Sequence, residues 1–302
     1  MDPRSGTIAV SERRTRMTAR PASRPHRVGD FLRARRDALR PEDVGLPREP
    51  GRRVPGLRRE EVAQLAGISP EYYLRLEQGR DHQPSGQVLA ALARALQLDV
   101  AGAQYLHRLV HPFQRRAVPA PRRGPARERD LVAVVAGFRN PAVALDRAKD
   151  VVAVNELAGA MAPEHHRPGR NVVLDTFDPQ VKATTPGWAE HARRVVASLR
   201  LTADLDDPRL QEVVGRLSLQ DDDFHRWWTS HEVSARTRGT LPLTLPGLGV
   251  VDMGWQDLEL ADHPGCVVTM FTPVDQAGED GLDALRARAG RARGRAAGVP
   301  VG

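Results

Sequence analysis

Residues 57–79, LRREEVAQLAGISPEYYLRLEQG, carry two short helical patterns separated by Gly67, and no other stretch restricts the fold as strongly. Gly67 provides the backbone freedom that a sharp turn requires. In the first pattern, Val62, Leu65 and Ala66 keep the spacing of one helix face and are expected to point inward. The stretch is therefore predicted to form two helices that meet at a tight turn inside a small helical domain.

The second of these helices is predicted to present a polar face to its surroundings. Ser69 is a good N-cap, Pro70 suits the first helical position, and Gly79 ends the helix. Tyr73 and Leu76 are three residues apart and should face the core. The residues left on the outward face are Pro70, Glu71, Tyr72, Leu74 and Arg75. Such a helix can enter the major groove of DNA.

Charge divides the 302-residue chain into a basic and an acidic part. Residues 1–126 have a net charge of +11, whereas residues 127–285 have a net charge of −9. The C-terminal end adds five arginines and no acid. This asymmetry indicates a nucleic-acid-binding module joined to a module that does not bind nucleic acid, although two ordinary solvated surfaces would give the same charges.

Composition excludes several classes of protein. Cys266 is the single cysteine, so an internal disulfide and a cysteine-based zinc finger are excluded. No apolar run approaches the ~18 residues of a membrane span, and the N-terminus lacks the apolar region of a secretory signal. We therefore expect a cytoplasmic protein that has no membrane partner. Residues 1–25 are expected to form a disordered leader, and Met17 is an alternative start to Met1.

Other helical patterns complete the predicted N-terminal domain, residues 26–112. They cover residues 28–39, 85–97 and 99–110. Residues 40–56 contain too many prolines and glycines for a helix, and Arg52 and Arg53 lie in this loop. The loop either contacts DNA phosphates or is simply a solvated basic loop. A Pro/Arg-rich linker is expected at residues 113–126.

Residues 27–111 resemble the helix-turn-helix domain of XRE-family transcriptional regulators, in their actinobacterial MmyB-like type. The resemblance is carried by PGLRREEVAQLAGISPEYYLRLEQGR and PSGQVLAALARALQLD, with LRPEDVGLP before them. It implies an all-α, lambda-repressor-like domain that binds double-stranded DNA.

The resemblance to MmyB-like regulators continues into the C-terminal part. It is carried there by VVAVNELAGAM, GRNVVLDTFDP, GWAEHARRVVASLR, DDFHRWWTSHEV and GLGVVDMGWQDLELADHPGCVVTMFTP. It implies a ligand-binding domain with a PAS-like fold and a small lipophilic, fatty-acid-like effector. Family members usually carry a histidine where this chain has Leu245, so a role of that histidine does not carry over to this chain.

The C-terminal domain, residues 127–275, is predicted from its own residues to be α+β. Apolar runs at 142–146 and 151–155 are typical of a hairpin, and helical patterns follow at 156–162, 187–201, 207–219 and 222–230. Strand patterns close the domain at 231–238, 241–245, 248–260 and 265–272. This order favours an antiparallel sheet with helices on one face. A helix and basic tail are expected at 276–302.

The space between such a sheet and its helices is where a small molecule would bind. The alternative for each candidate is an ordinary core residue, and it is favoured because a domain of this size needs most of its large apolar side chains for its core. The candidates for ligand contact are Val152, Val154, Leu157, Met161, Phe177, Trp188, Val195, Leu199, Phe224, Trp228, Val268 and Met270.

Alternatives to a binding site find little support in the sequence. Asp221 and His225 have i, i+4 spacing and His231 follows, but helix capping explains the aspartate without a metal. His165 and His166 lie in a Pro/Gly loop and are expected to be exposed, and Cys266 is expected to be a buried thiol. No nucleophile, phosphate-loop or metal motif is present, so we expect no enzyme activity, catalytic residue, metal or cofactor.

These patterns together predict a DNA-binding transcriptional regulator controlled by a small apolar effector. Because one short helix reads few base pairs, a homodimer is expected. A DNA-binding protein whose C-terminal domain only dimerises, binds a protein partner, or carries an enzymatic or metal site remains the alternative. The residues expected to contact DNA are Arg52, Arg53, Arg58, Arg59, Ser69, Pro70, Glu71, Tyr72, Arg75 and Arg80.

Overall fold

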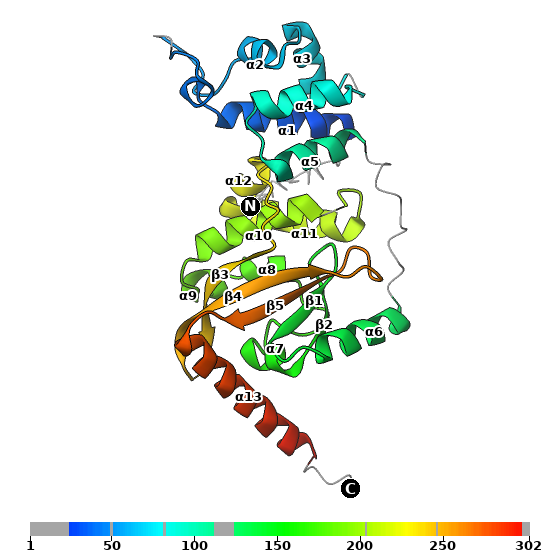
Figure 1. Ribbon diagram of the computed structural model, residues 1–302, viewed down its shortest axis with the longest axis vertical. Coiled ribbons are helices and arrows are strands. Elements are labelled where there is room, and N and C mark those ends of the chain that lie inside the picture. Colours follow the sequence, from blue (N-terminus) through cyan, green and yellow to red (C-terminus); the bar gives the residue numbers. More distant parts are fainter. Residues whose placement is uncertain are drawn as a thin grey trace, which may run out of the picture.

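A computed structural model describes residues 24–48, 51–80, 83–111, 124–202, 204–245 and 247–297. The expected leader up to residue 23, and residues 113–123 of the expected linker, lie outside the described residues. Residues 24–25 and 125–126 were also expected in the leader and the linker, but helices begin at Arg24 and at Pro125. The described chain forms an N-terminal helical domain and a C-terminal α+β domain (Figure 1). This is the predicted fold class, mainly α with an α+β domain, and it is confirmed.

The N-terminal domain consists of short helices packed around one apolar core. Phe31, Val62, Tyr73 and Leu92 are among its fully buried side chains. The helices are α1 Arg24–Ala38, the 3-10 helix η1 Pro41–Val44, α2 Arg59–Ala66, α3 Pro70–Glu77, α4 Gly86–Ala95 and α5 Val100–Val110.

The turn between α2 and α3 forms as its residues require. Gly67 has φ 64°, a left-handed conformation that costs glycine little. The Ser69 hydroxyl accepts a hydrogen bond from the backbone N–H of Tyr72 at 3.1 Å. The expectation for Leu65 is wrong, because this side chain is 38% exposed. Val62, Ala63 and Ala66 define the inward arc of α2, and Leu65 lies beyond its edge.

The C-terminal domain is built on a five-stranded antiparallel sheet with the order β2-β1-β5-β4-β3. The predicted hairpin forms β1 and β2. Strand β1 also pairs with β5, which connects the hairpin to the rest of the sheet. The strands are β1 Ala142–Leu145, β2 Val151–Val154, β3 Arg238–Leu245, β4 Gly249–Glu259 and β5 Val267–Pro273.

Helices cover both faces of this sheet, whereas the sequence predicted one covered face. Leu131 and Val135 of α6 pack against Ala144 and Val268 on one face. The opposite face meets α7, α10 and α13. The helices of the domain are α6 Pro125–Ala136, α7 Glu156–Met161, α8 Val172–Thr176, α9 Pro179–Thr184, α10 Trp188–Thr202, α11 Pro208–Gln220, α12 Asp222–Thr229 and α13 Gln276–Ala297.

Two other local predictions differ from the structure. The strand predicted at 231–238 is irregular up to Arg238, because Val233 packs against the core of the N-terminal domain instead of joining the sheet. The helix α6 has no counterpart in the prediction, and neither do α8 and α9. Helices α8 and α9 have five and six residues, too few to show helical periodicity, although Asn171 and Asp178 cap them.

The N-terminal domain rests on the helical layer of the C-terminal domain. In Figure 1, α1 and α5 face α10 and α12, whereas α2 and α3 lie on the far side. Arg27 forms an ion pair with Asp206 at 3.0 Å, and Leu201 of α10 packs against the N-terminal core. The two domains thus share an interface that leaves α3 accessible. Among the helices of the described ranges, none has both the length and the apolarity for a membrane crossing.

Candidate functional site

The outward face of α3 carries the residues that the sequence assigns to DNA contact. Ser69, Pro70, Glu71 and Arg75 are exposed, and Tyr72 is half-buried. The guanidinium of Arg75 lies over the Tyr72 ring, 5.4 Å from its centroid. This stacking restricts the side chain of Arg75 and leaves its N–H groups free to reach a groove.

Glu77 fixes α3 to the rest of the domain, a role that the sequence analysis missed. Its side chain is buried, and its two carboxylate oxygens accept from Nε of Arg36 at 2.6 Å and Nε of Arg59 at 2.7 Å. Burial opposes the charge of Arg36, but Glu77 more than offsets it and raises the Arg36 pKa. Glu77 lies four residues after Tyr73, on the inward face, so its spacing was the available signal.

The arginines expected to contact phosphates fall into two groups. Arg52 points inward and binds both carboxylate oxygens of Glu61 at 2.6 Å, which lowers the pKa of Glu61. Arg52 therefore holds the loop onto α2, and this internal pairing argues against a phosphate contact. Arg53, Arg59 and Arg80 are exposed and Arg58 is half-buried. These four flank α3 and remain the candidates for phosphate binding. Arg59 is kept although its Nε pairs with Glu77, because its side chain is 44% exposed, whereas that of Arg52 is 4% exposed.

A cavity of about 120 Å³ lies between the sheet and α10 of the C-terminal domain, and we call it the sheet pocket. Apolar side chains from the strands and α10 form most of its wall, among them Val143, Leu241, Trp255 and Phe271. The remaining lining residues are Leu145, Lys149, His166, Val172, His191, Arg194, Val195, Ser198, Arg236, Asp257 and Thr269.

The charged groups of the sheet pocket are mostly basic. Lys149, Arg194 and Arg236 line it against a single acid, Asp257, in the described chain. Arg194 donates to Nδ1 of His191 at 2.8 Å and stacks over Trp255.

Both histidines of the sheet pocket are held neutral. Burial lowers the pKa of His166 and of His191 to about 4, so neither adds charge near pH 7. His166 was expected to be exposed, but its ring packs against Phe271, and its Nδ1 lies 3.1 Å from the carbonyl oxygen of Ala158. The sheet pocket therefore combines an apolar wall with a net positive charge.

Of the apolar residues selected from the sequence, Val195 is the one that lines the sheet pocket. Val152 and Val268 pack toward α6, on the opposite face of the sheet. Met270 is two residues after Val268 in β5 and therefore lies on that same face. Val154, Leu157 and Met161 pack in the core beside α7. The members that pack in the helical layer above the pocket are Phe177, Trp188, Leu199, Phe224 and Trp228.

The residues considered for metal or redox chemistry have structural roles. Asp221 accepts from the backbone N–H of Phe224 at 2.9 Å, which caps α12, and it also pairs with Lys182. His225 is exposed. Cys266 is buried, and burial raises the pKa of its thiol although Arg127 donates to the sulfur. Leu245 is a fully buried core residue.

Comparison with protein families assigns both domains. A model described as the MmyB-like transcription regulator ligand binding domain matches residues 128–285. A model described as a helix-turn-helix domain matches residues 27–106, which span α1 to the middle of α5. Comparison with curated proteins gives no match.

Proposed function

Because the chain belongs to the MmyB-like family of transcription regulators, we propose that a small lipophilic effector in the sheet pocket controls its binding to specific DNA sites. The family assignment makes the protein a DNA-binding transcription regulator with a ligand-binding domain. Our proposal adds a fatty-acid-like effector and a homodimer as the DNA-binding form. We also propose that the protein is cytoplasmic, because a transcription regulator has to reach the DNA.

Helix α10 runs from the sheet pocket to the N-terminal domain, and this position is the main support for the proposal. Arg194, Val195 and Ser198 of this helix line the sheet pocket, and Leu201 at its end packs against the N-terminal core. One rigid element thus touches both the pocket and the DNA-binding domain. An effector that favours one position of α10 would therefore favour one position of the domain above it.

Arg200 is the main polar contact at the end of α10. Its side chain is 2% exposed, stacks 3.9 Å from the ring centroid of Trp228 and donates to the Trp228 carbonyl oxygen. It also donates to Nδ1 of His231 at 3.2 Å and interacts electrostatically with Tyr105 of α5. Burial lowers the pKa of Arg200. This arginine joins α5, α10 and α12 in one buried contact.

The position of α3 restricts how the effector can act. Since α2 and α3 face away from the C-terminal domain (Figure 1), that domain does not cover the DNA-binding face. Control by occlusion within one chain is therefore disfavoured. In a homodimer, two copies of α3 would have to lie about 34 Å apart to meet successive major grooves. A change in domain placement would alter this spacing and hence the affinity for DNA.

Arg75→Ala tests the assignment of α3. Selection from a random duplex pool should return a two-fold symmetric site whose half-sites are about one helical turn apart. The variant should lose about 1–3 kcal/mol of affinity for that site, because a base contact of Arg75 is removed. Fluorescence anisotropy measures the loss, and circular dichroism should show an unchanged melting temperature.

Arg216→Ala is the matched control, since this arginine lies on α11 of the other domain. It should leave the affinity for DNA unchanged. Equal affinities of the Arg75 variant and the unmodified protein would refute the role assigned to Arg75. Failure of the unmodified protein to select any duplex at low salt would refute the proposed DNA-binding function.

A further inference from the structure

The sheet pocket contains a buried lysine without a partner. The Lys149 side chain is 7% exposed and lines the cavity, and within the described residues its ammonium group makes no hydrogen bond or ion pair. Asp257 and Asp146 are the acids that act on it, and neither is in contact. Burying an unpaired ammonium is unfavourable and lowers the pKa of Lys149, so an anion bound beside this group would stabilise its charged form.

The turn between β1 and β2 is built so that Lys149 points inward. Lys149 has φ 65°, a left-handed conformation that is rare for residues other than glycine. One carboxylate oxygen of Asp146 accepts the backbone N–H groups of Ala148 at 3.0 Å and Asp150 at 2.9 Å, on either side of it. These contacts fix the backbone at the lysine.

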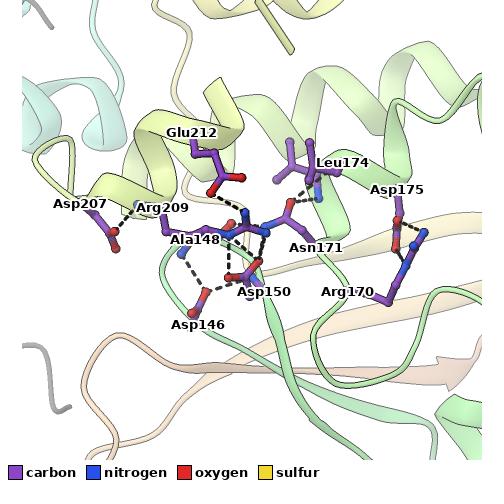
Figure 2. A network of polar contacts seen from close by, with 11 residues as sticks. Asp146, Ala148, Asp150, Arg170, Asn171, Leu174, Asp175, Asp207, Arg209 and Glu212 are labelled. Atoms are coloured by element: carbon purple, nitrogen blue, oxygen red, sulfur yellow. Dashed lines mark hydrogen bonds and ion pairs between the residues drawn. The ribbon is translucent and has the colours of Figure 1, made fainter. Parts of the chain in front are cut away.

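A second set of contacts anchors the same turn to α11 and α8. Figure 2 shows Asp150 between Arg209 and Asn171, with Asp146 below it. The Arg209 guanidinium pairs with Asp150 at 3.0 Å, and Asn171 donates to the Asp150 carboxylate at 2.7 Å and to the Ala148 carbonyl oxygen at 2.8 Å. The strained turn is thus held by contacts from two other elements, α11 and α8, and it places the buried Lys149 side chain in the sheet pocket.

The surrounding charges select for a negative ligand. Arg194 and Arg236 add positive charge, and His166 and His191 are neutral near pH 7. Asp257, the one acid that lines the pocket within the described chain, accepts a hydrogen bond from Thr269 at 2.6 Å. One anionic group beside Lys149 would reduce the excess positive charge that the protein leaves there.

The volume of the pocket limits the apolar part of the ligand. The cavity of about 120 Å³ is close in size to an engineered cavity of about 150 Å³ that binds benzene. Val143, Leu241, Trp255 and Phe271 provide an apolar wall for a body of that size. A long acyl chain would exceed this space.

We propose that the sheet pocket recognises a compact monocarboxylate, with an apolar body of about six carbon atoms, and that Lys149 pairs with the carboxylate. This inference rests on the proposed function, since it assumes that the sheet pocket is the effector site. It replaces a general fatty-acid-like effector by an acid of defined head group and size.

Isothermal titration calorimetry of the full chain with hexanoate and with 1-hexanol measures the contribution of the carboxylate to affinity, because the two ligands differ in the head group. Hexanoate should bind about tenfold to a hundredfold more tightly, because only the acid pairs with Lys149. Dodecanoate should gain no more than about tenfold over hexanoate, since its additional methylenes would lie outside the cavity. Equal affinity for acid and alcohol overturns the charge pairing and leaves the proposed function intact.

Lys149→Met is the variant that tests the residue itself, and Lys182→Met is its matched control. The chain contains only these two lysines, and Lys182 lies away from the pocket, paired with Asp221 and Asp223. Lys149→Met should abolish the preference for hexanoate and should raise the melting temperature without ligand, because the unpaired charge is removed. Lys182→Met should retain the preference. A Lys149 variant that still prefers hexanoate overturns the proposal.

Nuclear magnetic resonance of ¹³C-lysine-labelled protein provides an independent readout, because only two side chains are labelled. Burial lowers the pKa of Lys149, whereas Asp223 and Asp221 raise the pKa of Lys182 despite its desolvation. Lys149 should therefore titrate at the lower pH, and hexanoate should move its titration upward. If Lys149 titrates at the same pH as Lys182, the proposal is overturned. If no acid or alcohol binds, both the inference and the proposed effector site fail.

Discussion

Replacing Glu77 with alanine is expected to destabilise the N-terminal domain by about 3–5 kcal/mol, the usual cost of breaking a buried ion pair. Glu77 is 2% exposed, and its removal leaves Arg36 without its buried counter-charge. Arg59 loses its partner as well. Because Glu77 lies at the end of α3 and pairs with α1 and α2, the helix would also lose its fixed orientation. Binding to the selected duplex should decrease with it.

Urea unfolding, followed by circular dichroism, measures this loss. Glu71→Ala is the matched control, since Glu71 is an exposed acid in the first turn of the same helix. It should cost at most about 1 kcal/mol through the helix dipole. Equal unfolding midpoints for the two variants would show that the Glu77 contacts add nothing to stability.

Lowering the pH from 7 to 4.5 is expected to destabilise the protein by several kcal/mol through three histidines. Burial lowers the pKa of His166 and of His191 to about 4. Burial also lowers the pKa of His231 to about 3, and the positive charge of Arg200 lowers it further in the same direction. The unfolded chain binds protons below about pH 6.5, whereas the folded chain does not. The contribution of these neutral histidines to the free energy of unfolding is therefore fully present above pH 6.5 and is lost as the pH falls toward 4. The loss is about 3 kcal/mol each for His166 and His191.

Guanidinium unfolding at pH 7.5, 5.5 and 4.5 measures this slope, in a range where most carboxylates remain ionised. His191→Gln should remove its share of the pH dependence. His225→Gln, at an exposed position on α12, should leave the pH dependence unchanged. An unfolding midpoint that stays constant between pH 7.5 and 4.5 would contradict the neutral, buried state of these histidines.

The N-terminal domain could be predicted from the sequence because its signals are local. Gly67, Ser69 and Pro70 determine the turn and the start of α3 by their own backbone preferences. In the C-terminal domain, the alternation of apolar residues indicated the strands and their order along the chain. Most elements with regularly spaced apolar residues were therefore predicted, although α6, which buries Leu131 and Val135, was not.

The lining of the sheet pocket could not be predicted in the same way. In a strand, adjacent residues point to opposite faces, so selection of Val268 instead of Thr269 places the site on the wrong face of the sheet. The buried charges were hidden for another reason. Lys149, which is buried, and Arg194, which is half-buried, have no periodic signal that separates them from solvated residues, because their burial depends on partners distant in sequence.

The affinity of the full-length protein for its selected duplex, measured with and without a pocket ligand, tests the coupling between the two domains most directly. Fluorescence anisotropy should be recorded with saturating hexanoate, or with another carboxylate that titration shows to occupy the sheet pocket. We expect the affinity for DNA to change by about 5-fold to 150-fold, the usual range of allosteric coupling. An unchanged affinity for DNA while the pocket is occupied would contradict control of the DNA-binding domain through α10.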